Sequence, residues 1–138
     1  MKNKTVLVCV TAQKSSKFLI KSGKMIADEH GAKLEVISVL PMDSVGNTEI
    51  IEKLHEMTLE LGADMMVYFN DEPMLTVAAH ISTHNPELLV AGFPAQNSND
   101  FVSMIHSLIP ELPISMVEKD GTVYNMLPME LNQFLQKA

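Results

Sequence analysis

Short apolar runs alternate along the chain with stretches in which apolar positions recur every three or four residues. The short runs are typical of buried strands and lie at 5–11, 33–40, 65–69, 88–92 and 113–117. The amphipathic stretches between them predict helices that begin near Ser15, Asn47, Asp71 and Ser98. Strands that alternate with helices indicate a mostly parallel five-stranded sheet with helices on both faces.

The pattern changes after the fifth strand. The letters KDG at 119–121 predict a turn, and 122–126 predicts an antiparallel strand at the edge of the sheet. Pro128 then opens a short amphipathic tail helix. Internal repeats and linker-like stretches are absent from the sequence, so we predict one α/β domain over residues 1–138.

Charge and composition narrow the classes of partner. A net charge of −7 argues against nucleic-acid binding, which requires a basic surface. All ten basic residues are lysines, so a guanidinium fork for phosphate or carboxylate is lacking. Apolar runs are too short to cross a membrane, and the single cysteine, Cys9, suits a reducing compartment. We therefore expect a cytoplasmic protein without a membrane segment.

Three motifs suggest chemistry that their context does not support. The letters VGNTEII at 45–51 imitate a flavodoxin phosphate loop but follow the second strand instead of the first. Thr11, Asn70, Asp71 and Lys119 at strand ends resemble a response-regulator pocket, but paired acids after the first strand are missing. The serines lie outside any G-x-S-x-G motif and form no evident triad, so an enzyme is not predicted.

A fourth motif, HISTH, places two histidines four residues apart. His80 and His84 would share one face of a helix, a spacing that can chelate a metal. The sequence offers no evident third ligand. We therefore interpret the pair as a partly exposed helix face and predict no metal.

One long stretch resembles the universal stress protein family. Its first part, VLVCVTAQKSSKFLIKSGKMIADEHGAKLEVISVLP, is similar to the family's opening strand, helix and strand, and the VCV variant is most similar to the domain inside bacterial potassium-sensing histidine kinases. NPELLVAG and LIPELPISMV resemble the family's fourth and fifth strands. The resemblance implies a Rossmann-like sheet with strand order 3-2-1-4-5.

Family members that bind ATP carry the motif G-x2-G-x9-G-[S/T] after the fourth strand. Here Gly92 fills the first glycine position, Ala95 the second and Ile105 the third, and His106 replaces the final serine or threonine. Thr11 stands at the family's aspartate and Gln13 at its serine. We therefore expect weak ATP binding, and expect glycines at 95 and 105 to raise the affinity if the scaffold is otherwise intact.

The resemblance implies a non-enzymatic stress-response or signalling module that acts by homodimerisation and association with a signalling protein, without a cofactor. The alternative is a nucleotide-binding relative that holds ATP or AMP on a divergent loop. Its ligand residues would be Thr11, Gln13, Val39, Gly92, Ala95 and Ser98. An adenylyl-transferring enzyme would need S-G-G-x-D-S or H-I-G-H signatures, which the sequence lacks.

The edge of the sheet is the expected dimer interface. The runs 113–117 and 122–126 are adjacent and apolar, and an exposed edge strand must be paired or covered. The residues expected at a two-fold contact are Val117, Val123, Tyr124 and Met126.

Overall fold

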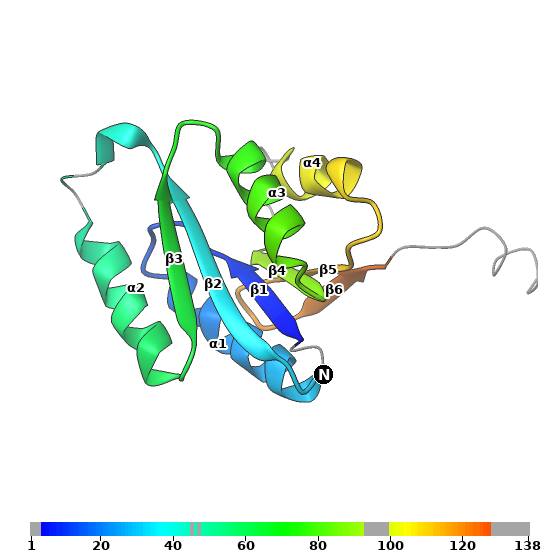
Figure 1. Cartoon of the computed structure of the whole chain (residues 1–138). Coiled ribbons are helices and arrows are strands. Elements are labelled where there is room, and N and C mark those ends of the chain that lie inside the picture. Colours follow the sequence, from blue (N-terminus) through cyan, green and yellow to red (C-terminus); the bar gives the residue numbers. More distant parts are fainter. Residues whose placement is uncertain (1–3, 45, 47, 93–99, 128–138) are drawn as a thin grey trace, which may run out of the picture.

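The chain forms a six-stranded sheet with helices on both faces (Figure 1). The computed structural model describes residues 4–44, 46, 48–92 and 100–127. The order of the strands is β3-β2-β1-β4-β5-β6. Their bounds are β1 Thr5–Cys9, β2 Lys33–Leu40, β3 Asp64–Phe69, β4 Leu88–Gly92, β5 Ile114–Val117 and β6 Val123–Met126.

Neighbouring strands are parallel except at one edge. The first five strands pair in parallel, and β6 joins β5 as an antiparallel edge strand. The predicted order 3-2-1-4-5 with an added antiparallel strand is therefore confirmed. The predicted tail helix after Pro128 lies outside the described residues.

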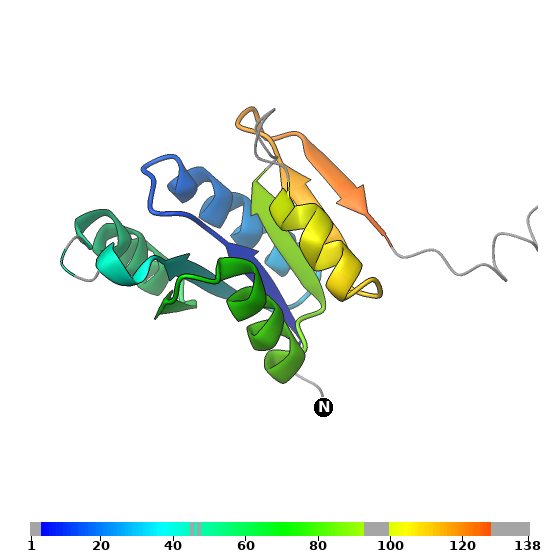
Figure 2. The same ribbon diagram turned by 90° about the horizontal axis from the view of Figure 1, so that it is seen from above.

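Two helices cover each face of the sheet (Figure 2). α1 (Ser16–Glu29) and α2 (Glu49–Glu60) pack on one face. α3 (Pro73–His84) and α4 (Asp100–Leu108) pack on the other. The central strand is buried from both sides, so Val6, Leu7 and Val8 are all inaccessible to solvent. This double cover explains why the central strands read as continuous apolar runs.

Local signals set several element ends. α3 begins at Pro73, whose missing N–H costs nothing in the first helical turn. It ends at Asn85, which adopts a left-handed φ of 47° that asparagine tolerates better than most residues. β1 ends at Cys9, two residues before the expected end, because the chain turns at Thr11. Between β2 and α2 a short 3₁₀ helix, η1 (Met42–Ser44), interrupts the predicted loop.

In the part of the chain that the structure describes, none of the helices has the length and apolar character needed to span a bilayer.

Candidate functional site

A pocket of about 1110 Å³ lies at the carboxyl ends of β1 and β4. These strands are neighbours in the sheet, but the chain leaves β1 towards α1 and reaches β4 from α3 on the opposite face. Ligands of open α/β sheets usually bind at the carboxyl ends of two neighbouring strands whose connections run to opposite faces of the sheet. The volume is slightly above the range of about 300–1,000 Å³ that small-molecule sites occupy.

The loop after β1 forms one wall of this pocket. The Gln13 N–H donates to the Thr11 carbonyl oxygen at 2.8 Å, and the buried Ser16 Oγ donates to the same oxygen at 2.7 Å. These bonds fix a tight turn that leads directly into α1. Thr11 and Gln13 are exposed and line the pocket.

The ends of β2 and β4, the two strands that flank β1, also line the pocket. Val39 and Gly92 line the pocket together with Thr11 and Gln13, so these four predicted ligand residues share one cavity. Ala95 and Ser98, the other two, belong to 93–99, outside the described residues. Among the described residues, a Cβ on Gly92 would meet only Leu19 Cδ2, at an ordinary contact distance of 3.8 Å.

The first turns of three helices add apolar side chains that the sequence analysis did not assign to the site. Phe18 of α1, Met74 of α3 and Phe101 of α4 all line the pocket. Phe18 is 57% exposed although it is a large apolar residue. Each of the three is an apolar residue in the first turn of a helix that follows a parallel strand. Such helix starts lie at the same edge of the sheet, so this pattern could have identified them as lining residues.

The turn between β5 and β6 gives the pocket its charge. Glu118 and Asp120 carry two carboxylates against one ammonium group on Lys119, among the described lining residues. A hydrogen bond from the Thr122 N–H to Asp120 Oδ1, 2.9 Å long, lowers the pKa of that carboxyl. The rim is therefore slightly negative at neutral pH, which disfavours polyanions.

Among the described residues that line the pocket, none forms an activated nucleophile. Burial raises the pKa of the Cys9 thiol to about 12, so the thiol stays protonated at neutral pH. The Ser16 hydroxyl donates to a backbone carbonyl, and histidine does not occur among the described lining residues. A serine or cysteine without a neighbouring base has no activated form.

Ile105 does not lie in this site. It is fully buried in α4 and packs in the core between α3, α4 and the sheet. Glycine at position 105 would therefore remove a large apolar side chain from the core, and its effect on ATP binding stays a matter for measurement. His106, beside it, also falls outside the described lining.

Four residues were predicted at the dimer interface. One of them, Val117, is buried within the sheet and does not lie at its edge. β5 lies between β4 and β6, and Val117 is 7% exposed. Val123 and Tyr124 lie on the edge strand and are 41% and 43% exposed. Met126, on the same strand, is half-buried against the core.

Comparison with known proteins reveals a shared fold. No protein-family model matches the sequence, and no curated protein is similar to it. A solved universal stress protein in complex with cAMP is 17% identical, with a TM-score of 0.64 over 86% of this chain and 99% of that one. The universal stress protein from Archaeoglobus fulgidus in complex with dAMP is 15% identical, with a TM-score of 0.61 over 83% of this chain and 97% of that one.

An enzyme shares the same architecture. The zinc-inhibited form of teicoplanin deacetylase Orf2 is 11% identical, with a TM-score of 0.58 over 91% of this chain and 73% of that one. At these identities the similarity establishes the fold, and the function has to be argued from the site.

Proposed function

We propose that this chain is a non-enzymatic, cytoplasmic signalling module of the universal stress protein type that binds an adenine mononucleotide or nucleoside and associates with its own copies. The pocket at the carboxyl ends of β1 and β4 carries the proposal. The fold shared with stress proteins solved with cAMP and dAMP supports it, as do the sequence motifs at 6–41 and 85–92.

The lining of the pocket and the charge of its rim indicate which adenine ligand fits. The apolar lining from Val39, Phe18 and Phe101 suits a purine ring, and Thr11 and Gln13 offer polar groups to a ribose. The slightly negative rim and the absence of arginine from the sequence disfavour three phosphates. A nucleoside or monophosphate therefore fits the pocket better than ATP.

Calorimetry with adenosine, AMP, cAMP and ATP–Mg²⁺ tests this choice. We expect at least one low-charge adenine ligand to bind and ATP to bind more weakly. Neutralising the rim with Glu118→Gln and Asp120→Asn should raise ATP affinity several-fold and change adenosine affinity little. The matched control is Glu56→Gln with Glu60→Gln on the exposed face of α2, which makes the same charge change far from the pocket.

Two results would overturn the ligand proposal. One is an ATP dissociation constant below about 10 µM, which corresponds to ~−7 kcal/mol. The other is no heat or chemical-shift change with any adenine ligand at millimolar concentration. Release of phosphate or adenine during long incubation would instead contradict the non-enzymatic assignment.

Self-association is proposed through β6. The Glu118 N–H donates to the Thr122 carbonyl at 2.9 Å, and bonded pairs alternate along an antiparallel ladder. The Val123 N–H therefore points away from β5, towards the outer edge. Pairing of β6 with the same strand of a second copy around a two-fold axis would use that edge and cover Val123 and Leu127, which is 67% exposed.

Light scattering on three chains tests the dimer. The parent and Val123→Thr, which keeps the amide and the β-branched shape, should have about twice the mass of 15.3 kDa. Val123→Pro removes the outward amide without breaking a bond to β5, and it should shift the protein to monomer. A monomeric parent at high concentration, or a dimeric Val123→Pro, would show that β6 is not the interface.

A further inference from the structure

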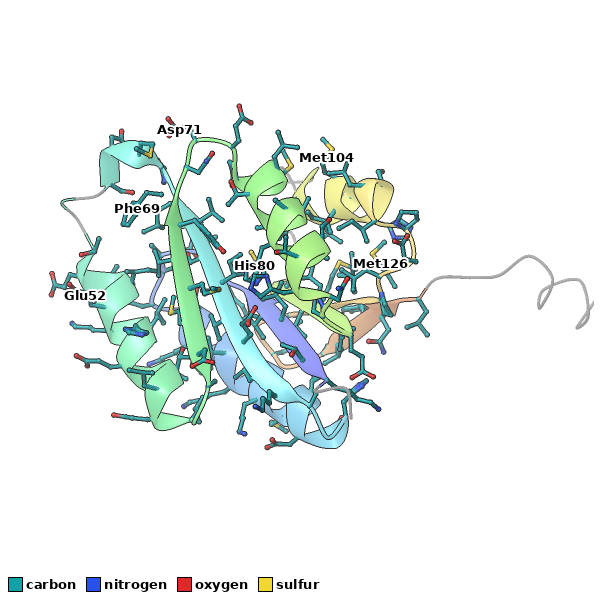
Figure 3. The ribbon with its side chains drawn as sticks, in the orientation of Figure 1. Glu52, Phe69, Asp71, His80, Met104 and Met126 are labelled. Carbon is teal, nitrogen blue, oxygen red and sulfur yellow. The ribbon has the colours of Figure 1, made fainter. Side chains whose placement is uncertain are left out.

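Three metal-ligating side chains meet between α3 and the sheet, away from the pocket. His80 and His84 come from α3 and Glu35 comes from β2, and one ligand atom of each lies within 4.8 Å of the others. The Nε2 atom of His80 is 2.5 Å from Glu35 Oε1. Figure 3 shows His80 in the space between α3 and the sheet.

Burial differs along the cluster. His80 is 3% exposed, Glu35 is half-buried and His84 is exposed. The cluster therefore begins under the helix and opens to solvent at His84. None of the three residues is among the described residues that line the pocket.

The hydrogen bonds of His84 define which of its nitrogens is available. Its Nδ1 lies 3.0 Å from the backbone carbonyl oxygen of His80. Nδ1 also lies 2.9 Å from the Thr83 hydroxyl, which can donate or accept. The carbonyl oxygen only accepts, so in the tautomer with its hydrogen on Nδ1, this nitrogen donates to the His80 carbonyl. In the neutral ring Nε2 then keeps its lone pair, which is the form that binds a metal.

His80 has a matching arrangement. Its Nδ1 lies 3.0 Å from the Tyr68 hydroxyl, and this hydroxyl donates to the sulfur of Met66 at 3.9 Å. The oxygen can therefore accept from a His80 Nδ1–H, which leaves Nε2 facing Glu35. The two imidazole rings stack with centroids 3.9 Å apart and planes within 8° of parallel.

We propose that Glu35, His80 and His84 bind a divalent transition-metal ion of the zinc type. Two imidazoles and one carboxylate are a common ligand set for Zn²⁺, whereas Mg²⁺ and Ca²⁺ prefer oxygen ligands alone. The exposed side next to His84 leaves a position for water. Tyr68 and the His80 carbonyl hold the Nδ1 atoms of the two ligands, as outer partners do in metal sites.

A simpler interpretation is an ion pair between His80 and Glu35 that anchors α3 to β2. That interpretation requires nothing of His84, which lies on the exposed side of the pair. The two interpretations therefore differ in what they predict for His84, and this residue decides the test.

Zinc titration of the untagged full chain, by calorimetry with a competing chelator, measures the site directly. We expect one Zn²⁺ per chain and at least a tenfold loss of affinity in His84→Ala and in Glu35→Gln. Tyr68→Phe should lose about tenfold, within the range of about 10–100-fold for outer partners. The control is His55→Ala, an exposed helical histidine on α2, which should bind as the parent does.

Two further measurements do not depend on the heat of binding. Co²⁺ should give visible d–d absorption in the parent and His55→Ala and much less in His84→Ala. Zn²⁺ should also raise the melting temperature of the parent, because it binds the folded state, and this shift should disappear in His84→Ala. His84 is exposed, so its replacement should leave the fold intact, which circular dichroism verifies.

The proposal is overturned if the parent binds no Zn²⁺ at micromolar concentration, or if His84→Ala binds it as tightly as the parent. It is also overturned if Mg²⁺ or Ca²⁺ displaces Zn²⁺ at similar concentration, because the site would then not select a transition metal. Each outcome is independent of whether the pocket at β1 and β4 binds an adenine ligand.

Discussion

Gly23 of α1 lies so close to Val8 of β1 that a Cβ at position 23 would overlap the Val8 Cγ2 methyl. Such a Cβ would also lie only 3.4 Å from Leu34 Cδ1 on β2. Glycine therefore lets α1 approach the two central strands at a position where the helix faces the core. This approach also sets where the first turn of α1, which lines the pocket, meets the sheet.

The substitution Gly23→Ala should lower the free energy of unfolding by about 1–3 kcal/mol through overpacking. Alanine is the better helix former by about 1 kcal/mol, so the sign of the effect is informative. Urea denaturation measures it, and Lys21→Ala, at an exposed position of α1, should change stability by less than about 0.5 kcal/mol. A Gly23→Ala protein as stable as the parent would show that the overpacking costs only about the 1 kcal/mol that alanine gains in helix propensity.

Two buried serines should respond to alanine with opposite signs. Ser38 on β2 is fully buried, and its Oγ has no hydrogen-bond partner in the described part of the chain. Removing an unsatisfied hydroxyl should stabilise the protein by about 1 kcal/mol. Melting curves of Ser38→Ala should therefore shift upwards.

Ser115 on β5 is the matched control, because its Oγ donates to Asn125 Oδ1 at 2.6 Å across the β5–β6 ladder. Ser115→Ala should lose about 1 kcal/mol of stability. Equal shifts of the two variants would contradict the assignment of hydrogen-bond partners.

The Cys9 thiol should be almost inert in the folded protein. Its pKa rises from an ordinary 9.0 to about 12 because burial disfavours the thiolate. At pH 8 the folded chain should hold about a thousandfold less thiolate than the unfolded chain, and reaction with a disulfide reagent should slow accordingly. Comparison of rates in buffer and in urea tests this, and Cys9 is the single thiol of the sequence.

The same shift has a consequence for stability at high pH. The unfolded thiol loses its proton from about pH 9, whereas the folded one keeps it to about pH 12. Its contribution is therefore complete below pH 9 and is lost as the pH rises towards 12. Stability should fall less steeply over this range in Cys9→Ala than in the parent.

Replacing Ile105 should damage the core without creating a phosphate site. Ile105→Ala should cost about 2–5 kcal/mol, and Ile105→Gly should cost more because glycine also weakens the helix. Calorimetry should detect no gain in ATP affinity for either variant. The control is Met104→Ala, which is next to it in α4 and 41% exposed, and which should be nearly neutral. A folded Ile105→Gly chain with tighter ATP binding would contradict this assignment.

Most of the fold could be predicted from local patterns. Strand and helix positions follow from the period of apolar residues, which each segment carries by itself, and the antiparallel edge strand followed from the turn at 119–121. The end of β1 was placed two residues too late, because a hydrogen-bonded turn at Thr11 stops the strand where the apolar pattern continues. Hydrogen bonds such as those at Thr11 depend on how the chain continues in space, which the period of apolar residues does not include.

The pocket was predictable in outline. The family resemblance named Thr11, Val39 and Gly92 as ligand residues of the nucleotide-binding alternative, and the structure places all three in one cavity at the carboxyl edge of the sheet. Phe18 and Phe101 were missed, since their inclusion depends on how far each helix start leans over that edge. Ile105 belongs to the apolar pattern of the fourth helix and is buried there, although the motif spacing aligns it with a phosphate-loop glycine. A motif spacing by itself does not say which side of a helix faces the core.

The sequence by itself determined that His80 and His84 share a face, because the pitch of an α-helix brings residues four apart together. Only the tertiary structure placed Glu35 beside them, across 45 residues of chain. That contact depends on where α3 lies on β2 and how it is rotated, and both are decided by the packing of the whole core on that face. A local pattern can therefore supply two ligands of a metal site, but the third comes from non-local packing.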